Sequence, residues 1–156
     1  MRGRSGDGRS IAGDSLYREV ILSHYRNPTY RQTVDNANVF ASAHNPLCGD
    51  ELDLTARIDQ GRVAEAGFEA RACSIVHASA DIMAGLILGK SPDEVFELAE
   101  RFEEMMSGDD PELGPQLGEL TALREVRRYP VRVRCALLPW STIKTALQSP
   151  GAPETA

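Results

Sequence analysis

The sequence has little of what several classes of protein require. Its 156 residues include only three cysteines, no long apolar run and no excess of positive charge. No stretch approaches the roughly 18 apolar residues of a membrane span, and the N-terminus lacks the apolar core of a secretory signal. The net charge of −6 disfavours general nucleic-acid binding, because phosphate contacts need clustered cations. We therefore expect a soluble, cytoplasmic protein without nucleic-acid or membrane partners.

The scarcity of cysteine also disfavours a disulfide framework. The cytosol keeps thiols reduced, and an odd number of cysteines cannot pair completely. Cys48, Cys73 and Cys135 are therefore buried packing groups, metal ligands or reactive thiols. Nucleophile-elbow, phosphate-loop and paired acid–base motifs are all missing, so these cysteines are the main candidates for chemistry.

The periodicity of the chain predicts strands first and helices afterwards. Residues 38–43 form a short predicted strand, and period-two alternation over 51–58 and 63–70 predicts a hairpin with its turn at 59–62. Strands that precede helices indicate an α+β fold, a small three-stranded antiparallel sheet with helices packed on one face. We expect one domain over 14–148 between disordered tails at 1–13 and 149–156.

Capping and breaking residues divide the helical regions. Asp14 is the expected N-cap of a first helix that Asn27-Pro28 stops. An apolar stripe over 75–87 ends at Gly89, and a capping box over 91–94 opens a helix through Met106. A short helix over 117–126 and a last helix from Pro130 toward Leu147 complete the prediction.

The topology brings two cysteines together. Cys48 leads into the second strand and Cys73 follows the third, and these ends lie at the same end of an antiparallel meander. Cys73 also begins a helix, where the macrodipole favours a thiolate. Gly49 allows Cys48 and Asp50 to turn toward one centre. With Cys135, in the opening turns of the last helix, these residues would make a tetrahedral zinc site, although buried packing remains an alternative.

Other polar residues are weaker candidates. We expect His24 to be a partly buried packing residue and His44 to be a surface group or a partner of a site residue. His77, one turn after Cys73, is a helix-surface residue or a neighbour of the site. Several arginines gather near the last helix and form a solvated face or a docking surface for an acidic partner; they are Arg124, Arg127, Arg128, Arg132 and Arg134.

Four segments together resemble a known family. "LYREVILSHYRNP", "NPLCGD", "FEARACSIVHASADIM" and "VRVRCALLPW" occur in the order found in the SufU branch of the IscU/NifU-type proteins of iron–sulfur cluster assembly. The resemblance covers roughly 16–147 and implies the IscU/SufE-like α+β fold. It also implies that Cys48, Asp50, Cys73 and Cys135 are the metal ligands.

The resemblance implies one of two functions. One is a zinc-dependent sulfurtransferase that accepts persulfide sulfur from a pyridoxal-phosphate cysteine desulfurase of the SufS type. The other is a scaffold that holds a transient [2Fe–2S] cluster on the same ligands. IscU-type scaffolds carry a histidine before the last cysteine, whereas this chain has Arg134, which cannot ligate a metal. This difference and the long segment over 88–129 favour sulfur transfer. An adaptor with a purely structural zinc is a third reading.

The implied mechanism gives Cys48 the central role. A histidine of the desulfurase displaces Cys48 from zinc, and the freed thiolate attacks the desulfurase persulfide. The sulfur then passes onward, with the SUF scaffold complex as a further partner. Arg132 matches an arginine of the SufU pattern, where it pairs with Asp50, steers the persulfide, or forms only a surface salt bridge. Pro139 departs from several SufU-like sequences, and we expect it to loosen the helix beside Cys135.

Overall fold

Three antiparallel strands form the sheet. The computed structural model describes residues 8–46, 49–108 and 115–148. Strands β1 (Val39–Asn45), β2 (Asp50–Asp59) and β3 (Arg62–Arg71) pair as a meander in the order β1-β2-β3. The predicted strands and the predicted α+β class are confirmed.

The helical elements follow the expected order with two differences. They are α1 (Gly8–Arg26), α2 (Ser74–Ile87), α3 (Pro92–Met106), the 3₁₀ segment η2 (Pro115–Arg128) and α4 (Pro130–Gln148). The predicted N-cap at Asp14 is wrong, because α1 already begins at Gly8. The predicted helix over 117–126 is 3₁₀ in type and is interrupted at Gly118, whose φ of 51° and ψ of −129° are not helical.

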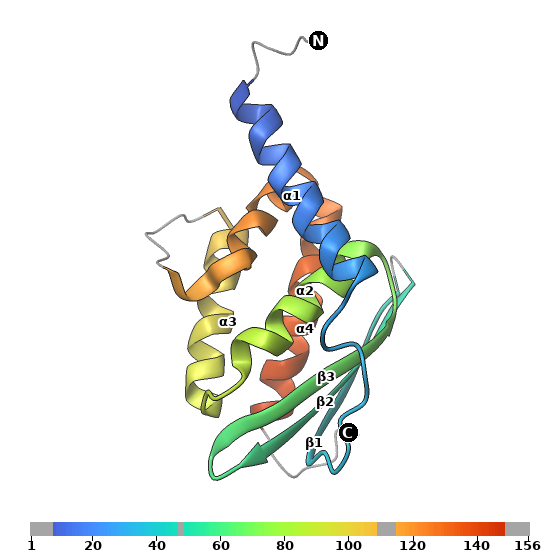
Figure 1. Cartoon of the computed structure of the whole chain (residues 1–156), viewed down its shortest axis with the longest axis vertical. Coiled ribbons are helices and arrows are strands. Elements are labelled where there is room, and N and C mark those ends of the chain that lie inside the picture. Colours follow the sequence, from blue (N-terminus) through green and yellow to red (C-terminus); the bar gives the residue numbers. More distant parts are fainter. Residues whose placement is uncertain (1–7, 47–48, 109–114, 149–156) are drawn as a thin grey trace.

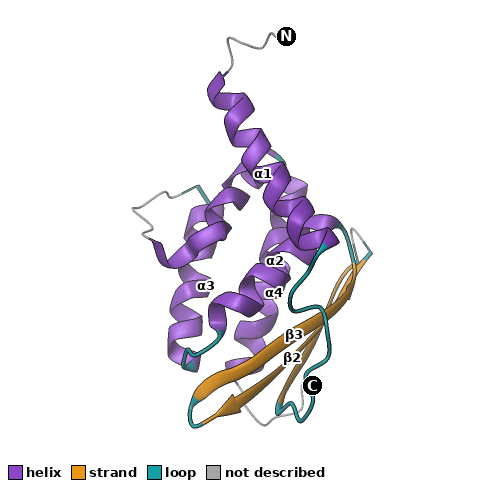
Figure 2. Ribbon diagram, in the orientation of Figure 1, coloured by secondary structure: helices purple, strands orange, loops and turns teal. Residues whose placement is uncertain are grey.

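The helices cover one face of the sheet (Figures 1 and 2). α2 packs on β3 and α4 packs on β1, while α1 and η2 pack on α2, and α3 packs on α4. Residues 88–90 connect α2 to the Ser91–Glu94 capping box of α3, in which each residue's side chain accepts a hydrogen bond from the other's backbone N–H. Within the described ranges, no helix combines the length and the apolar character needed to cross a bilayer.

The alternation of β2 decides which residues face the helices. Leu52, Leu54 and Ala56 are buried at 1%, 3% and 1% exposure, whereas the residues between them lie toward the other face. Asp50 belongs to the same inward row and is 3% exposed. The strand that builds the core therefore also carries a carboxylate to the covered side of the sheet.

The connection between α1 and β1 lies tightly against β3. The Phe68 backbone N–H donates to the Tyr30 carbonyl at 3.0 Å. A Cβ atom at Gly67 would lie 2.3 Å from the Gln32 carbonyl oxygen, so the absence of a side chain allows this contact. Gly67 thereby holds the segment after α1 against the sheet.

Candidate metal centre

The Asp50 carboxylate is the centre of a buried cluster. Its Oδ1 accepts a hydrogen bond from the Cys73 backbone N–H at 3.2 Å, and its Oδ2 lies 3.4 Å from the Cys135 Sγ, which donates to it. The first contact spans 23 positions of the chain, and the second spans 85. A single carboxylate therefore links β2 to the beginning of α2 and to α4.

Three of the four predicted ligands converge at this point. Cys73 is the N-cap residue of α2, and Cys135 is fully buried on α4. One ligand atom from each of Asp50, Cys73 and Cys135 lies within 4.8 Å of the other two. The predicted role of Cys48 concerns a residue outside the described ranges.

Two local features hold the cluster in place. The Ser79 hydroxyl donates to the Ala136 carbonyl at 2.6 Å in the interior, which ties α2 to α4 beside Cys135. Gly49 has a φ of +73°, and its N–H donates to the Asn45 carbonyl at 2.8 Å. No atom lies within 4 Å of a Cβ built at Gly49, so the left-handed backbone, rather than lack of space, favours glycine here. This agrees with the turn that the sequence predicted.

The surroundings of the cluster favour the protonated form of the Cys135 thiol. Burial raises the pKa of the Cys135 thiol well above its ordinary value, and the neighbouring Cys73 thiol and Asp50 carboxylate add to the shift. Without a cation, the Cys135 thiol therefore stays protonated and donates a hydrogen bond to the Asp50 carboxylate. A divalent ion that binds thiolates would reverse this balance, because it stabilises the deprotonated sulfur.

The donor set fits zinc. Tetrahedral Zn²⁺ prefers thiolate sulfur at about 2.3 Å and carboxylate oxygen at about 2.0–2.2 Å, which separates neighbouring donors by about 3.5–3.8 Å. The Asp50 Oδ2 to Cys135 Sγ distance of 3.4 Å is close to this spacing. The other two pairs of donor atoms lie within 4.8 Å of each other, so the side chains would need to move only slightly to reach tetrahedral spacing. Asp50, Cys73 and Cys135 could thus supply three donors to a metal ion.

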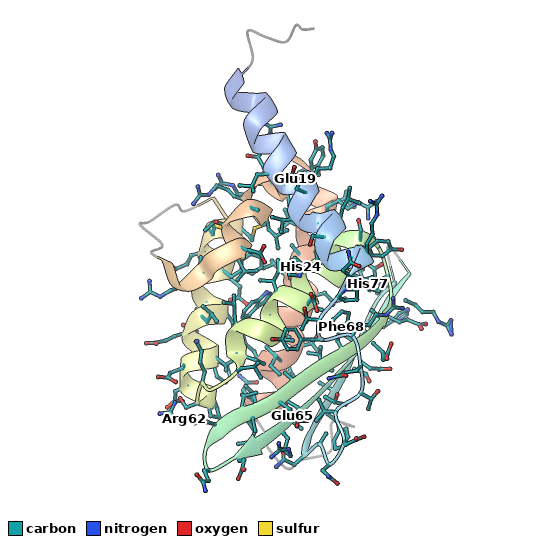
Figure 3. The ribbon with its side chains drawn as sticks, viewed as in Figure 1. Glu19, His24, Arg62, Glu65, Phe68 and His77 are labelled. Carbon is teal, nitrogen blue, oxygen red and sulfur yellow. The ribbon has the colours of Figure 1, made fainter. Side chains whose placement is uncertain are left out.

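His77 lies beside the cluster without belonging to it. Its ring packs edge-on against Tyr25 and Phe68, with centroids at 5.1 and 5.9 Å, and the residue is only 3% exposed. Figure 3 labels His77 and Phe68. The helix-surface alternative is therefore wrong. Burial lowers the pKa of His77, with a smaller effect from Arg31, so the imidazole is neutral. Its ring nitrogens are not among the three clustered donors.

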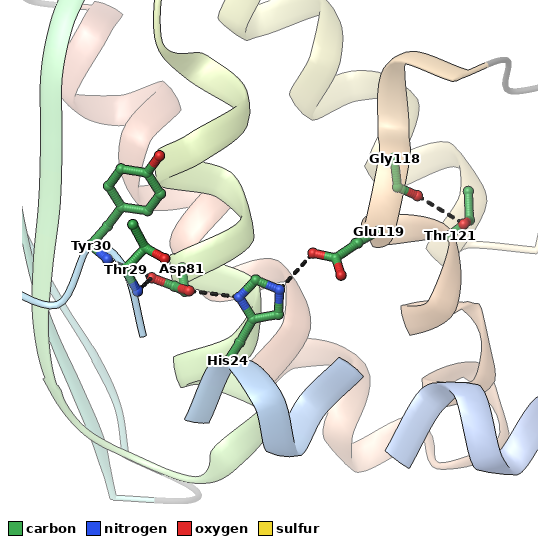
Figure 4. Close-up of polar contacts among 7 residues, drawn as sticks. All are labelled: His24, Thr29, Tyr30, Asp81, Gly118, Glu119 and Thr121. Atoms are coloured by element: carbon green, nitrogen blue, oxygen red, sulfur yellow. Dashed lines mark hydrogen bonds and ion pairs between the residues drawn. The ribbon is translucent and has the colours of Figure 1, made fainter. Parts of the chain in front are cut away.

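His24 lies in a polar network rather than in simple packing (Figure 4). Its Nδ1 lies 2.6 Å from Asp81 Oδ2, and its Nε2 lies 2.6 Å from Glu119 Oε1. Asp81 also accepts hydrogen bonds from the backbone N–H groups of Thr29 and Tyr30 at 3.0 and 2.8 Å. The hydrogen bond to Asp81 raises the pKa of His24, despite partial burial. Sequence reasoning missed this network, although an aspartate inside the apolar stripe of α2 was its signal.

The remaining predicted residues have simpler surroundings. His44 is an exposed residue of β1, opposite Glu51, which agrees with the surface alternative. In the arginine group, the Arg128 Nε lies 3.3 Å from the Glu125 carboxylate, and Arg127 donates to the Met105 carbonyl at 3.3 Å. These two arginines therefore serve contacts within the molecule. α4 is continuous through Pro139, whose side chain is buried.

A cavity of about 290 Å³ opens beside Cys73. It lies between α1, the beginning of α2 and α4. Arg132 lines it, which brings this predicted site neighbour to the same cavity as Cys73. Sequence reasoning did not identify the α1 side of the cavity, although helical spacing puts Tyr17, Ile21 and their neighbours on one face. The lining residues are Tyr17, Arg18, Ile21, Leu22, Cys73, Ser74, Ile75 and Arg132.

Comparison with known proteins defines the class to which this fold and cluster belong. Residues 16–148 match the family described as the NifU-like N terminal domain, and the chain belongs to this family. The family expected from the sequence motifs is thereby confirmed. The zinc-dependent sulfurtransferase SufU of Bacillus subtilis (strain 168) is 37% identical over 131 residues, which cover 84% of this chain and 88% of that protein.

Two further relatives bear on the same family. The iron–sulfur cluster assembly scaffold protein IscU of Thermotoga maritima is 36% identical over 138 residues, covering 88% of this chain and 96% of that protein. The crystal structure of a protein from Fervidobacterium islandicum AW-1, described as an iron–sulfur cluster assembly scaffold protein for the SUF system (FiSufU), has a TM-score of 0.78 at 32% identity, covering 85% of this chain and 97% of that chain. Identity to SufU and to IscU is nearly equal, so similarity alone does not separate a sulfurtransferase from a scaffold.

Proposed function

We propose that this protein is a zinc-dependent sulfur acceptor in iron–sulfur cluster assembly. It takes persulfide sulfur from a pyridoxal-phosphate cysteine desulfurase of the SufS type on Cys48 and passes it onward. The observation that carries the proposal is the convergence of Asp50, Cys73 and Cys135, three donors that suit zinc. The 37% identity to a zinc-dependent sulfurtransferase supports it. Arg134 supports it as well, because a guanidinium does not replace the metal-binding histidine of an IscU-type scaffold.

In this proposal, all four residues bind the metal, and Cys48 alone also carries the sulfur. Cys73, Cys135 and Asp50 would hold zinc, with Cys48 as the fourth donor. Bound zinc would keep coordinated sulfur deprotonated at neutral pH. The Cys73 N–H orients the Asp50 carboxylate through the 3.2 Å hydrogen bond, and Ser79 fixes α4 against α2. The described donors are thus tied together by hydrogen bonds, while Cys48 precedes β2 in the sequence and lies outside the described ranges.

The transfer is a thiol–persulfide exchange. The Cys48 thiolate attacks the outer sulfur of the desulfurase persulfide, a new S–S bond forms, and the older S–S bond breaks. The desulfurase cysteine leaves as a thiolate, and Cys48 becomes the persulfide. Electrons balance without an oxidant or reductant, because one persulfide is exchanged for another. Docking of the desulfurase is the event that frees Cys48 to react.

Metal analysis combined with an activity assay tests the proposal. The purified wild type should be colourless with about one zinc per chain, and Asp50→Ala should lose that zinc. Asp53→Ala is the matched control, because Asp53 is an exposed carboxylate on the same strand and faces away from the cluster. The wild type should stimulate turnover of a SufS-type desulfurase. Cys48→Ala should keep a wild-type circular dichroism spectrum and lose the stimulation.

The principal alternative is a scaffold for a [2Fe–2S] cluster. The same donors suit iron–sulfur ligation, and the 36% identical IscU of Thermotoga maritima is named a scaffold. Anaerobic purification would then give a coloured protein containing iron and sulfide. Full desulfurase stimulation by Cys48→Ala would instead reject Cys48 as acceptor and favour an adaptor with a structural zinc.

A further inference from the structure

β1 lies at an edge of the sheet, and its outer side has no partner strand (Figure 1). β2 pairs with it along Val39–Asn45. In the described parts of the chain, no backbone hydrogen bond joins residues 39–44 to any segment other than β2. Every second residue of an edge strand points its N–H and C=O groups away from the sheet. β1 therefore offers a row of backbone donors and acceptors that no other strand uses.

The opposite edge of the sheet, β3, is covered by two connecting segments. The Phe68 N–H donates to the Tyr30 carbonyl at 3.0 Å, in the connection between α1 and β1. The Val63 N–H donates to the Lys90 carbonyl at 2.9 Å, and the Val63 carbonyl accepts from the Gly89 N–H at 2.8 Å. Proteins commonly cover a sheet edge in this way, or protect it with charged residues, proline or a bulge. The fold thus occupies the edge at β3 and leaves the edge at β1.

β1 also lacks the other features that keep an edge strand from pairing. Its sequence VFASAHN contains no lysine, arginine, aspartate, glutamate or proline, and its register with β2 is constant. Phe40 is 55% exposed, and Ser42 and His44 are exposed on the same face of the sheet. Because the strand carries no charged residue of either sign, two copies of it can meet without placing like charges opposite each other.

The helix beneath β1 presents uncharged residues next to the same edge. α4 packs against β1 and β2 on one side and against α2, α3 and η2 on others, so its exposed side is the one beside the edge of β1. After Arg134, that side continues with the half-buried Leu138 and the exposed Ser141, Thr145 and Gln148. The Ser141 and Thr145 hydroxyls donate to carbonyls of their own helix at 3.2 and 3.1 Å, so covering them leaves neither donor without a partner.

We propose that β1 pairs antiparallel with β1 of a second copy of this chain, about a two-fold axis at Ser42, and joins the two sheets into one of six strands. This axis aligns all seven residues of both strands and sets the exposed Phe40 of one copy opposite His44 of the other. It also brings the exposed sides of the two α4 helices next to each other. The inference does not depend on the proposed function.

The proposed dimer leaves both metal centres accessible. Asn45 is paired with Asp50 and lies three residues from the axis, which is about 10 Å along a strand. The two-fold axis places the Asn45 residues of the two copies on opposite sides, about 20 Å apart. The two clusters therefore lie at opposite ends of the joined sheet, and each can meet its own partner.

Sedimentation equilibrium of the full chain tests the association. The mass should rise from one chain to two over about 5–500 µM and no further, because a two-fold interface closes on itself, and a small interface predicts a dissociation constant of about 10–100 µM. In the dimer, isotope-filtered NMR on a mixture of labelled and unlabelled protein should show contacts between the Phe40 ring of one copy and the His44 ring of the other. Amide exchange of alternate residues in 39–45 should slow as the concentration rises.

A lysine at the axis should break the dimer. Ser42→Lys places two ammonium groups opposite each other and should raise the dissociation constant at least about tenfold. Ser107→Lys is the matched control, because Ser107 is exposed at the end of α3, a helix that packs on α4 and η2 rather than on the sheet. Circular dichroism of both variants should match that of the wild type.

Three results would overturn the proposal. They are a single-chain mass at every concentration, a dimer that Ser42→Lys leaves intact, and a dimer of the wild type without the contact between Phe40 and His44. The last of these needs no variant, so it decides the matter even if Ser42→Lys fails to fold. Protection of β1 amides that appears only when the desulfurase is added would also overturn self-pairing, in favour of a strand from that partner.

Discussion

The His24 network gives the most direct test of the energetics, through the substitution His24→Ala. The His24 imidazole lies 2.6 Å from both Asp81 and Glu119, and the Asp81 side chain is only 1% exposed. In the variant, Asp81 keeps its two backbone donors and loses its cationic partner. A hydrogen bond to a buried charge contributes about 1.5–3 kcal/mol, whereas the 58% exposed Glu119 adds no more than about 0.5 kcal/mol. We expect a loss of about 2–3 kcal/mol where His24 is protonated.

The loss should depend on pH in one direction only. The pKa of His24 is raised from its ordinary value of 6.5, chiefly by the hydrogen bond to Asp81. A raised pKa means that the stabilisation is complete below the unfolded value and declines as pH rises through the folded value. The difference between wild type and His24→Ala should therefore be largest near pH 5.5 and fall to about 1 kcal/mol at pH 9, where only a neutral hydrogen bond remains.

Urea unfolding followed by circular dichroism at both pH values measures this difference. His44→Ala is the matched control, because His44 is exposed on β1, and its free energy of unfolding should match that of the wild type at both pH values. Glu119→Gln should lose no more than about 0.5 kcal/mol. A His24→Ala deficit that is the same at pH 5.5 and pH 9, or larger at pH 9, would refute the assignment of a charged pair.

Three further predictions concern the sheet, the loop and the metal. Gly67→Ala should lower the free energy of unfolding by about 2–3 kcal/mol, since its Cβ would lie 2.3 Å from a backbone carbonyl; an unchanged urea midpoint would disprove the contact. Gly49→Ala should cost about 1–2 kcal/mol in metal-free protein through its φ of +73°, measured by the same method, and no loss would mean that the turn relaxes. Chelation of zinc should lower the Tm of the wild type by roughly 5–10 °C and leave the Tm of Asp50→Ala unchanged. An equal fall in Tm for both proteins in calorimetry would show that Asp50 does not bind the metal.

Local rules predicted those parts of the fold that depend on neighbours in the chain. The Ser91–Glu94 capping box needs only residues three apart, and α3 begins at Pro92 as predicted. Strand alternation likewise predicted which residues of β2 face the helices. The meander placed Cys73 near the beginning of β2, because antiparallel pairing fixes which strand ends meet.

Contacts between distant elements were beyond such rules. The approach of Cys135 to Asp50 depends on how α4 packs against the sheet, and chain spacing carries no information on that angle. The position of His77 on its own helix suggested an exposed residue. It is buried because α1 brings Tyr25 over it. The partners of His24 come from α2 and η2, and no local pattern connects them. The scarcity of cysteine and the family resemblance made Cys135 a candidate ligand, whereas the packing of α4 brings its sulfur to Asp50.

The inward position of Asp50 gives the metal a consequence for folding. A slip of one residue in the pairing of β2 would turn Asp50 to the uncovered face together with Leu52 and Leu54. Misaligned hairpins would then lack the oxygen donor as well as the core, and zinc would stabilise only correctly aligned chains. The amount of zinc bound per chain during refolding would therefore measure the fraction of molecules in which β2 has paired in its native register.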